Sequence, residues 1–205
     1  EVGKRVRSET AIARGTTSLS QAAVAMARAE LGSLEGRTTL VMGAGEMGEA
    51  MAQALAGSLE SGRLLVANRT WSRAIELAAR CGGRAIEWSD LMEGLVEADV
   101  VLASAGAPEV LLEASELQRV LARRTGRPLL MVDIAVPRDV DPAVAELAGV
   151  TLLDMEDLSA FADRAMEGRR QEVPRAELII DAELERYLGL SAERQAAPLV
   201  ASLCE

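Results

Sequence analysis

The sequence predicts an α/β fold with a doubly wound parallel sheet, extended at its C-terminal end by a long helix. Short apolar runs alternate with segments of helical pattern between residues 38 and 154. This alternation is typical of parallel sheets with right-handed crossovers. Beyond residue 154 no further strand pattern follows, and residues 155–188 favour a helix. We therefore expect a connector at 1–17, a sheet domain at 18–154 and a helical extension at 155–205.

The expected elements follow one another in a regular order. Residues 1–17 are polar with mixed charges, and we expect an extended connector. A helix is predicted at 18–31, because this segment is rich in alanine and Ser18 or Ser20 can cap its N-terminus. The strands are predicted at 38–42, 63–68, 84–88, 99–104, 128–134 and 150–154, and the helices between them at 49–55, 71–81, 90–97 and 113–124. The strand at 128–134 is almost continuously apolar, as burial on both faces requires.

The C-terminal segment predicts a long amphipathic helix. Its apolar residues fall roughly on one face, at Leu158, Phe161, Ala165, Val173, Ala176, Ile180, Leu184 and Tyr187. A helix of ~34 residues would span ~50 Å, more than a small domain. We therefore expect it to pack against a partner subunit or another domain, unless it folds back on its own sheet. Gly168 and Pro174 predict a break or kink, and residues 192–205 have the pattern of a further element that begins there.

Composition restricts the classes of function. The chain has 22 Lys and Arg against 32 Asp and Glu, and its net charge of −10 opposes broad binding to phosphate backbones. It contains no histidine, and its two cysteines, Cys81 and Cys204, lack the spacing of a metal site or a disulfide framework. We therefore expect no metal centre and a reducing, cytoplasmic location. No apolar run reaches the ~18 residues of a membrane span, so we expect no membrane partner.

The most informative motif is Gly-Ala-Gly-Glu-Met-Gly, which lies between a predicted strand and a predicted helix. This is the context that the dinucleotide-binding fingerprint of a Rossmann domain requires. Gly43 permits the sharp turn, Gly45 lets the backbone approach a pyrophosphate, and Gly48 lets the helix pack close to the strand. Free N–H groups at the helix N-terminus hold the phosphates. We expect the whole turn to bind the cofactor, namely Gly43, Ala44, Gly45, Glu46, Met47 and Gly48.

The end of the second strand favours NADP over NAD. An NAD site usually has a carboxylate ~20 residues after the glycines, whereas this chain has Asn68, Arg69 and Thr70 there. Arg69 offers a guanidinium that can bind a 2′-phosphate through two hydrogen bonds, and Asn68 and Thr70 add neutral donors. The alternative for Arg69 is an exposed charge at a turn. The sequence therefore predicts NADPH as the cofactor and an NADP-binding Rossmann domain at 18–154.

Two further loops follow predicted strands. Residues 104–108, Ser-Ala-Gly-Ala-Pro, either line the nicotinamide side of the site through Ser104 or form a simple Gly/Pro loop. The charged run 133–142 either closes the cleft, or its Arg138 and aspartates satisfy helix ends and one another. Cys81 is expected to be a small buried hydrophobe, and no Ser–His or Cys–His pair is possible without histidine. We therefore predict no catalytic residue in this chain.

Several of these runs, in this order, resemble the glutamyl-tRNA reductases. They are Gly3–Thr10, Gly43–Gly48, Ala67–Thr70, Ser104–Pro108 and Asp133–Pro142, of which the last is the most specific. The resemblance extends to about residue 190. It implies an NADPH-dependent enzyme that reduces glutamyl-tRNA to glutamate-1-semialdehyde at the entry of tetrapyrrole (porphyrin) biosynthesis. It also implies a V-shaped homodimer, in which a long spinal helix links a catalytic, a cofactor and a dimerisation domain.

The resemblance has limits. In that family a nucleophilic cysteine and a nearby histidine precede the matched region, and neither Cys81 nor Cys204 matches the position of the nucleophile. We therefore expect the chain alone to be inactive, with contacts to glutamyl-tRNA made by missing or truncated domains. Two alternatives stay open. One is a non-catalytic module that binds NADP or a protein partner through its helical tail. The other is a fragment of a shikimate dehydrogenase-like reductase, which shares the Asn-Arg-Thr turn.

Overall fold

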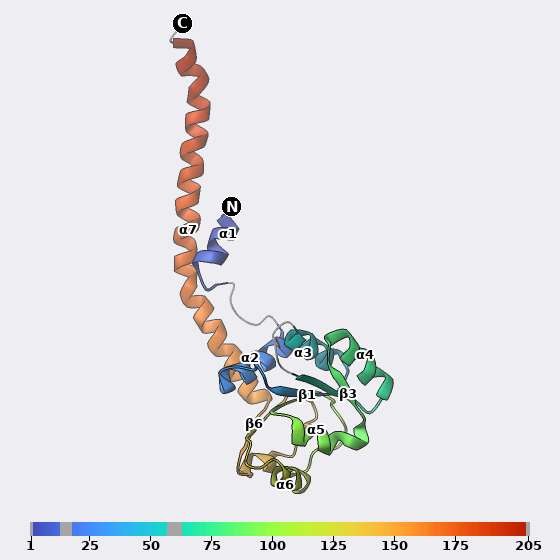
Figure 1. The fold of residues 1–205 in the computed structure, drawn as a ribbon. Helices are drawn as coiled ribbons and strands as arrows, with labels where there is room; N and C mark the ends of the chain where they lie inside the picture. Colours follow the sequence, from blue (N-terminus) through green and yellow to red (C-terminus); the bar gives the residue numbers. More distant parts are fainter. Residues whose placement is uncertain (1, 13–17, 57–62, 204–205) are drawn as a thin grey trace. The chain divides into compact units, whose positions relative to one another are not determined.

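The computed structural model describes residues 2–12, 18–56 and 63–203, with side chains described as far as residue 189. Contacts divide the chain into two units (Figure 1). The larger unit comprises residues 16–162, and the smaller unit comprises residues 1–15 and 163–205. The boundaries that we expected after residues 17 and 154 stay predictions.

The larger unit is built on a six-stranded sheet in which every pair of neighbours is parallel, in the order β3-β2-β1-β4-β5-β6. The strands are β1 (Thr38–Met42), β2 (Arg63–Ala67), β3 (Arg84–Ile86), β4 (Val100–Ala103), β5 (Leu129–Asp133) and β6 (Val150–Leu153). The order changes direction at β1, and ligands of such sheets bind beyond the carboxyl ends of the strands at this switch point. The predicted fold class is confirmed.

Helices cover both faces of this sheet (Figure 1). They are α2 (Leu19–Leu31), α3 (Glu46–Ala56), α4 (Trp71–Cys81), α5 (Leu91–Glu97) and α6 (Ala114–Arg123), with short 3₁₀ turns η1 (Trp88–Asp90) and η2 (Pro142–Glu146). Because successive side chains of a strand point to opposite faces, the strands feed two cores. Val41 and Val66 pack with α2, α3 and α4, whereas Leu40 and Leu65 pack with α5 and α6. Our prediction did not include η2, which Asp141 caps by accepting the Ala143 N–H.

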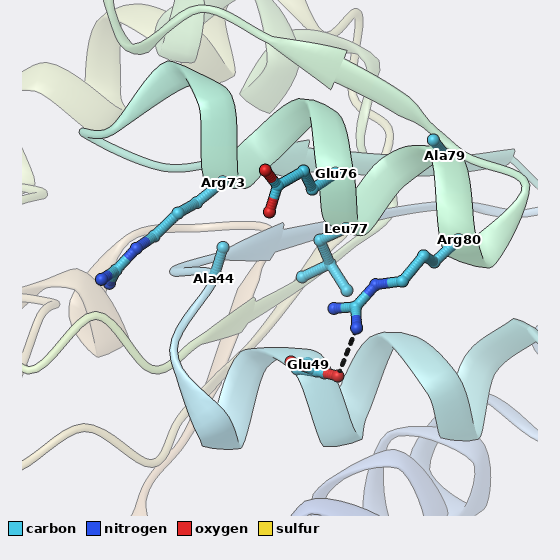
Figure 2. A pocket seen from close by; sticks show the side chains of 7 residues that line it. All are labelled: Ala44, Glu49, Arg73, Glu76, Leu77, Ala79 and Arg80. Carbon is cyan, nitrogen blue, oxygen red and sulfur yellow. Dashed lines mark ion pairs between the residues drawn. The ribbon is translucent and has the colours of Figure 1, made fainter.

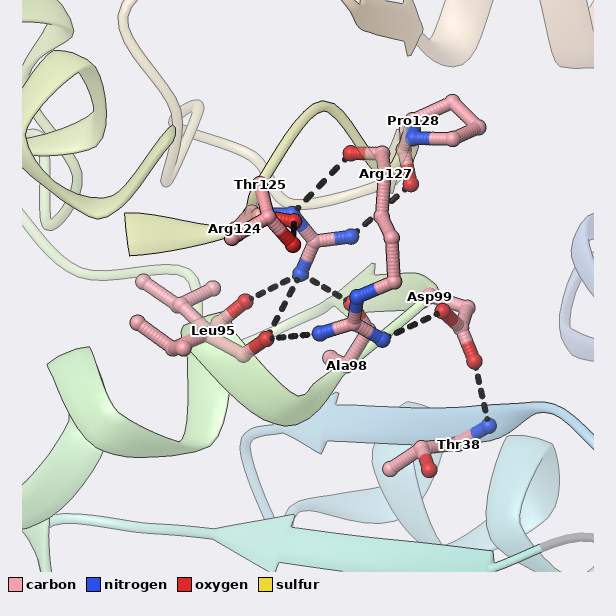
Figure 3. A network of polar contacts seen from close by, with 9 residues as sticks. Thr38, Leu95, Ala98, Asp99, Arg124, Thr125, Arg127 and Pro128 are labelled. Carbon is pink, nitrogen blue, oxygen red and sulfur yellow. Dashed lines mark hydrogen bonds and ion pairs between the residues drawn. The ribbon is translucent and has the colours of Figure 1, made fainter. Parts of the chain in front are cut away.

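A buried cation, Arg124, joins the segments that precede β4 and β5 (Figure 3). Arg124 is only 1% exposed. Its Nη1 donates to the carbonyl oxygens of Leu95 (2.6 Å), Val96 (3.1 Å) and Ala98, and its Nη2 donates to that of Pro128 (2.8 Å). A guanidinium therefore caps the carbonyl end of α5, where positive charge is favourable. Burial lowers the pKa of this guanidinium.

In the smaller unit, α1 (Val2–Glu9) lies beside α7 (Met155–Leu203), whose first residues belong to the larger unit. Our expectation of an extended connector is therefore wrong for residues 2–9, and residues 13–17 lie outside the described residues. Arg5 donates to Glu9 (2.7 Å) and to Glu183 of α7 (2.5 Å), and the Ala11 N–H donates to Glu172 (2.9 Å). So short a helix is marginal alone, and α7 supplies the contacts that hold it.

The helix α7 continues without a break through Gly168 and Pro174 as far as Leu203. Of the expected break or kink, the break is wrong and the kink stays a prediction, and residues 192–203 prolong the same helix instead of beginning a further element. Pro174 removes one backbone donor, but the residues around it are mostly strong helix formers such as Glu, Arg, Ala and Leu. Among the described residues, no helix is both long and apolar enough to cross a membrane.

Candidate functional site

The glycine-rich turn joins β1 to α3 at the switch point of the sheet. Gly43 has a φ of +102°, and a Cβ atom added to it would lie 2.9 Å from the Ala105 nitrogen. A Cβ atom added to Gly48 would lie 1.9 Å from the Gly43 carbonyl oxygen. At Gly45, in contrast, an added Cβ atom meets nothing within 4 Å. Two glycines are thus required by packing, and the third leaves open the space in which a bound group can approach the backbone.

Asn68 joins this turn to the loop that follows β2. Its Oδ1 accepts the Ala44 N–H at 3.0 Å, and its Nδ2 donates to the carbonyl oxygen of Thr70 at 3.0 Å. Both ends of the side-chain amide are therefore used within the protein. Asn68 thus braces the turn against the end of β2, and its second Nδ2 hydrogen as a neutral donor to the cofactor stays a prediction.

Arg69 and Thr70 lie at the carboxyl end of β2 and are exposed. Thr70 precedes α4, and its side chain makes no capping hydrogen bond there. Arg69 is close enough to Asp139 to lower the pKa of that carboxyl, although burial raises this pKa by more. An exposed guanidinium next to the glycine-rich turn is in the position that a 2′-phosphate site requires.

A pocket of about 610 Å³ lies beside the turn, between α3 and α4 (Figure 2). Its lining residues are Ala44, Glu49, Arg73, Glu76, Leu77, Ala79 and Arg80. Glu49 and Arg80 form an ion pair of 2.8 Å across it, whereas the Arg73 guanidinium has no acceptor among the described residues. Figure 2 shows Arg73 extending toward the side of the pocket where Ala44 lies.

Sequence reasoning missed Arg73. The signal for it in the sequence was its place four residues after Arg69, in the first turn of α4. Arg73 lines the pocket, and both it and Arg69, at the preceding turn, are exposed.

Ser104 lies directly against the turn, as its predicted position at the end of β4 requires. Its N–H donates to the Met42 carbonyl oxygen at 2.9 Å, and its Oγ donates to the same oxygen at 3.4 Å. A Cβ atom added to Gly48 would lie 3.2 Å from this Oγ. The hydroxyl is thus turned toward the end of β1, and the residues after it form the adjacent wall.

Two aspartates of the charged run 133–142 accept backbone N–H groups of neighbouring loops. Asp139 is fully buried, and its carboxylate accepts the N–H groups of Ala105 (2.6 Å) and Ala107 (3.2 Å). Asp133, only 3% exposed, accepts the N–H groups of Ala135, Asp139 and Val140 at 2.9–3.0 Å. Burial raises the pKa of both carboxyls. Closure of the cleft by this run stays a prediction, and of the alternative only the helix cap is seen, at Asp141, because Asp133 and Asp139 bond loop N–H groups.

Arg138 of the same run pairs with Asp154 at 2.7 Å. Cys81, at the end of α4, is half-buried, and burial raises the pKa of its thiol. A thiol of this kind is a poor nucleophile. Cys204 lies outside the described residues. Within the part of the chain that the structure describes, no group of three or more His, Cys, Asp or Glu residues could hold a metal ion.

Comparison with known proteins gives a consistent result. The chain is 44% identical over 202 residues to a glutamyl-tRNA reductase of Desulforudis audaxviator. The aligned region covers 98% of this chain and 45% of that protein. The solved structure of the glutamyl-tRNA reductase from Methanopyrus kandleri has a TM-score of 0.87 and 39% identity, covering 98% of this chain and 50% of that chain. A family model described as shikimate / quinate 5-dehydrogenase matches residues 25–161, more than half of the chain.

The chain belongs to the family of this model and, within it, to the glutamyl-tRNA reductases. It corresponds to their nucleotide-binding Rossmann region and spans about half the length of the relatives it matches. The shikimate 5-dehydrogenase of Listeria monocytogenes shares only 16% identity, with a TM-score of 0.51 over 79% of this chain and 62% of that chain. That likeness shows the fold alone. The shared family model thus reflects a common domain, and the high identity lies with the glutamyl-tRNA reductases.

Proposed function

We propose that this chain is the NADPH-binding region of an enzyme that reduces glutamyl-tRNA to glutamate-1-semialdehyde in tetrapyrrole biosynthesis. The observation that carries the proposal is the glycine-rich turn, which is packed tightly at Gly43 and Gly48 and open at Gly45. Identity of about 40% to glutamyl-tRNA reductases over nearly the whole chain supports the substrate. When bound, NADPH supplies the hydride for the reduction.

Each side chain near the turn has a proposed role. The turn at residues 43–48 holds the pyrophosphate, chiefly through the N–H groups at the start of α3, because a helix N-terminus favours anions. Arg69 and Arg73 bind the 2′-phosphate of the adenosine. Asn68 holds the glycine-rich turn in place by accepting the Ala44 N–H. Since no carboxylate follows β2, the ribose hydroxyls of NAD lack their usual acceptor. This is the reason to propose NADPH instead of NADH.

Hydride transfer also requires an activated carbonyl, and the described residues of this chain offer no nucleophile at the turn. The half-buried Cys81 lies at the far end of α4, with its thiol pKa raised. We therefore propose that the chain by itself binds the cofactor without reducing glutamyl-tRNA. Contact with the tRNA is proposed for the rest of the enzyme, because the chain is strongly acidic.

The cofactor proposal is tested by calorimetric titration of this chain with NADPH and NADH. We expect NADPH to bind at least tenfold more tightly, since a bidentate arginine–phosphate pair is a strong, charge-assisted contact. Arg69→Glu should weaken NADPH far more than NADH, whereas Arg28→Glu, on the exposed side of α2, should change neither. Equal losses for both nucleotides in Arg69→Glu would contradict the assignment of Arg69.

We propose further that α7 mediates a homodimer. Exposed apolar side chains recur on it at intervals of seven residues, at Met166, Val173, Ile180 and Tyr187. A seven-residue spacing of apolar residues is the pattern by which helices pair in coiled coils, and a second copy of α7 presents the same row. Ile180→Glu should halve the mass measured by light scattering, and Glu177→Gln, at an exposed position on the same helix, should leave it unchanged. A wild-type chain that is monomeric at high concentration would refute this.

A further inference from the structure

The loop after β4 directs its backbone N–H groups at a single buried carboxylate. The N–H groups of Ala105 and Ala107 donate to the two oxygens of Asp139, at 2.6 and 3.2 Å, and the Gly106 N–H acts to lower the pKa of the same carboxyl. Gly106 has a φ of +60°, which brings successive N–H groups to one side of the chain. Such a concave arrangement binds anions. Here the anion is a side chain of the protein itself.

Asp139 is held in place from behind. Its side chain is fully buried, and its own N–H donates to the Asp133 carboxylate at 2.9 Å. Asp133 ends β5 and also accepts the N–H groups of Ala135 and Val140. The two aspartates therefore connect the end of β5 to the loop after β4 by hydrogen bonds alone, without a cation between them.

This loop forms one wall of the glycine-rich turn. A Cβ atom added to Gly43 would lie 2.9 Å from the Ala105 nitrogen, so the loop and the turn are in close contact. The Ser104 N–H also donates to the carbonyl oxygen of Met42, at the end of β1. A shift of the loop by a few tenths of an ångström thus changes the shape of the turn. Since β4 and β2 lie on opposite sides of β1, the loop and Arg69 border opposite halves of the site.

We propose that Asp139 is a positioning residue, which holds residues 104–107 as the wall of the nicotinamide half of the cofactor site. This inference rests on the proposed function. The carboxylate fills the anion-binding loop and keeps its N–H groups from rotating toward the cofactor. Asp139 therefore acts chiefly on the nicotinamide half of NADPH, and it reaches the adenosine half only through the attraction of its charge to the exposed Arg69.

The test compares two ligands in calorimetric titrations of this chain. NADPH reports on both halves of the site, and adenosine 2′,5′-bisphosphate reports on the adenosine half alone. Asp139→Asn keeps the shape of the side chain but places an amide donor against one of the loop N–H groups. We expect it to weaken NADPH about tenfold, the loss of one charge-assisted hydrogen bond, and to change binding of the bisphosphate less than twofold.

The matched control is Asp141→Asn. This carboxylate lies two residues further on and accepts only the Ala143 N–H, at 2.9 Å, as the cap of η2. The variant should bind both ligands like the wild type. If Asp139→Asn fails to fold, Gly106→Ala perturbs the same loop through its positive φ. It should weaken NADPH severalfold and spare the bisphosphate.

The outcomes separate this inference from the proposed function. A wild-type chain that binds neither ligand would refute the proposed function and this inference with it. A wild-type chain that binds both, with an Asp139→Asn variant that binds NADPH equally well, would refute this inference alone. An equal loss of both ligands in that variant would also overturn it, because Asp139 would then be a purely structural residue.

Discussion

Replacing Gly48 with alanine tests how the glycine-rich turn is packed. The new Cβ atom would lie 1.9 Å from the Gly43 carbonyl oxygen and 2.8 Å from its carbonyl carbon. Ordinary contact begins at 3.4 Å, so the turn and α3 would have to separate by about 1.5 Å. A backbone oxygen cannot rotate away as a flexible side chain can. Since overpacking costs about 1–3 kcal/mol, we expect the free energy of unfolding to fall by about 3 kcal/mol, at the upper end of that range.

The assay is urea unfolding followed by tryptophan fluorescence. Trp71 and Trp88 are the two tryptophans of the chain, and both lie in the larger unit, so the signal reports on that unit. With a slope of about 2 kcal/mol per molar urea, the midpoint of Gly48→Ala should fall by about 1.5 M. A midpoint equal to that of the wild type would refute the packing argument.

Gly45→Ala is the matched control, with the same chemical change three residues earlier. Its Cβ atom meets nothing within 4 Å, and its φ is not in the left-handed region. We expect stability within about 0.5 kcal/mol of the wild type. NADPH binding should nevertheless fall at least tenfold, because the methyl group occupies the space where the pyrophosphate approaches the backbone. A Gly45→Ala variant that binds NADPH normally would contradict the placement of the phosphates.

Three further predictions concern single side chains. Arg124→Ala should destabilise the larger unit by about 3 kcal/mol in the same urea assay, because it leaves buried carbonyl oxygens without donors. The control Arg123→Ala removes an exposed ion pair with Glu93 and should cost less than about 1 kcal/mol. Because burial raises the pKa of Asp133, the folded state binds its proton more tightly than the unfolded chain does. The free energy of unfolding of the wild type relative to Asp133→Asn should therefore rise as the pH falls from 7 through the raised pKa, and level off below 3.8. Arg73→Ala should weaken adenosine 2′,5′-bisphosphate severalfold in calorimetry, because it removes a cation beside the 2′-phosphate.

Each of these predictions has a clear contrary result. Equal stability losses in Arg124→Ala and Arg123→Ala would show that burial of the guanidinium is not what matters. A difference between the wild type and Asp133→Asn that shrinks as the pH falls would contradict the raised pKa. Unchanged binding of the bisphosphate to Arg73→Ala would place the 2′-phosphate away from the pocket between α3 and α4.

The local pattern of the sequence was sufficient to predict the sheet and the glycine-rich turn. Each strand and the glycine motif are encoded within a few neighbouring residues, by apolar runs and by the backbone freedom of glycine. For this reason the order of strands and α-helices from 38 to 154, and the position of Gly43–Gly48 between a strand and a helix, were predicted correctly. Ser104 was placed next to the turn by topology, since β4 must pair beside β1 in such a sheet.

Contacts between distant residues were not predictable in this way. The helix at residues 2–9 depends on Glu183 and Glu172, more than 160 residues away, so its own short sequence could not reveal it. The expected break in α7 followed a local rule for Gly and Pro, and the helix continues through both. Asn68 and Arg73 received their places from the fold, one as a brace of the turn and the other as the wall of a pocket.

The doubly wound sheet and the dinucleotide-type turn at its centre follow from the amino-acid order alone. The surroundings of the turn follow from the fold, because the Asp139 carboxylate and the N–H groups it accepts are more than thirty residues apart. Strands and turns form through neighbouring residues, whereas the burial and hydrogen bonding of a charged group depend on residues from the whole chain.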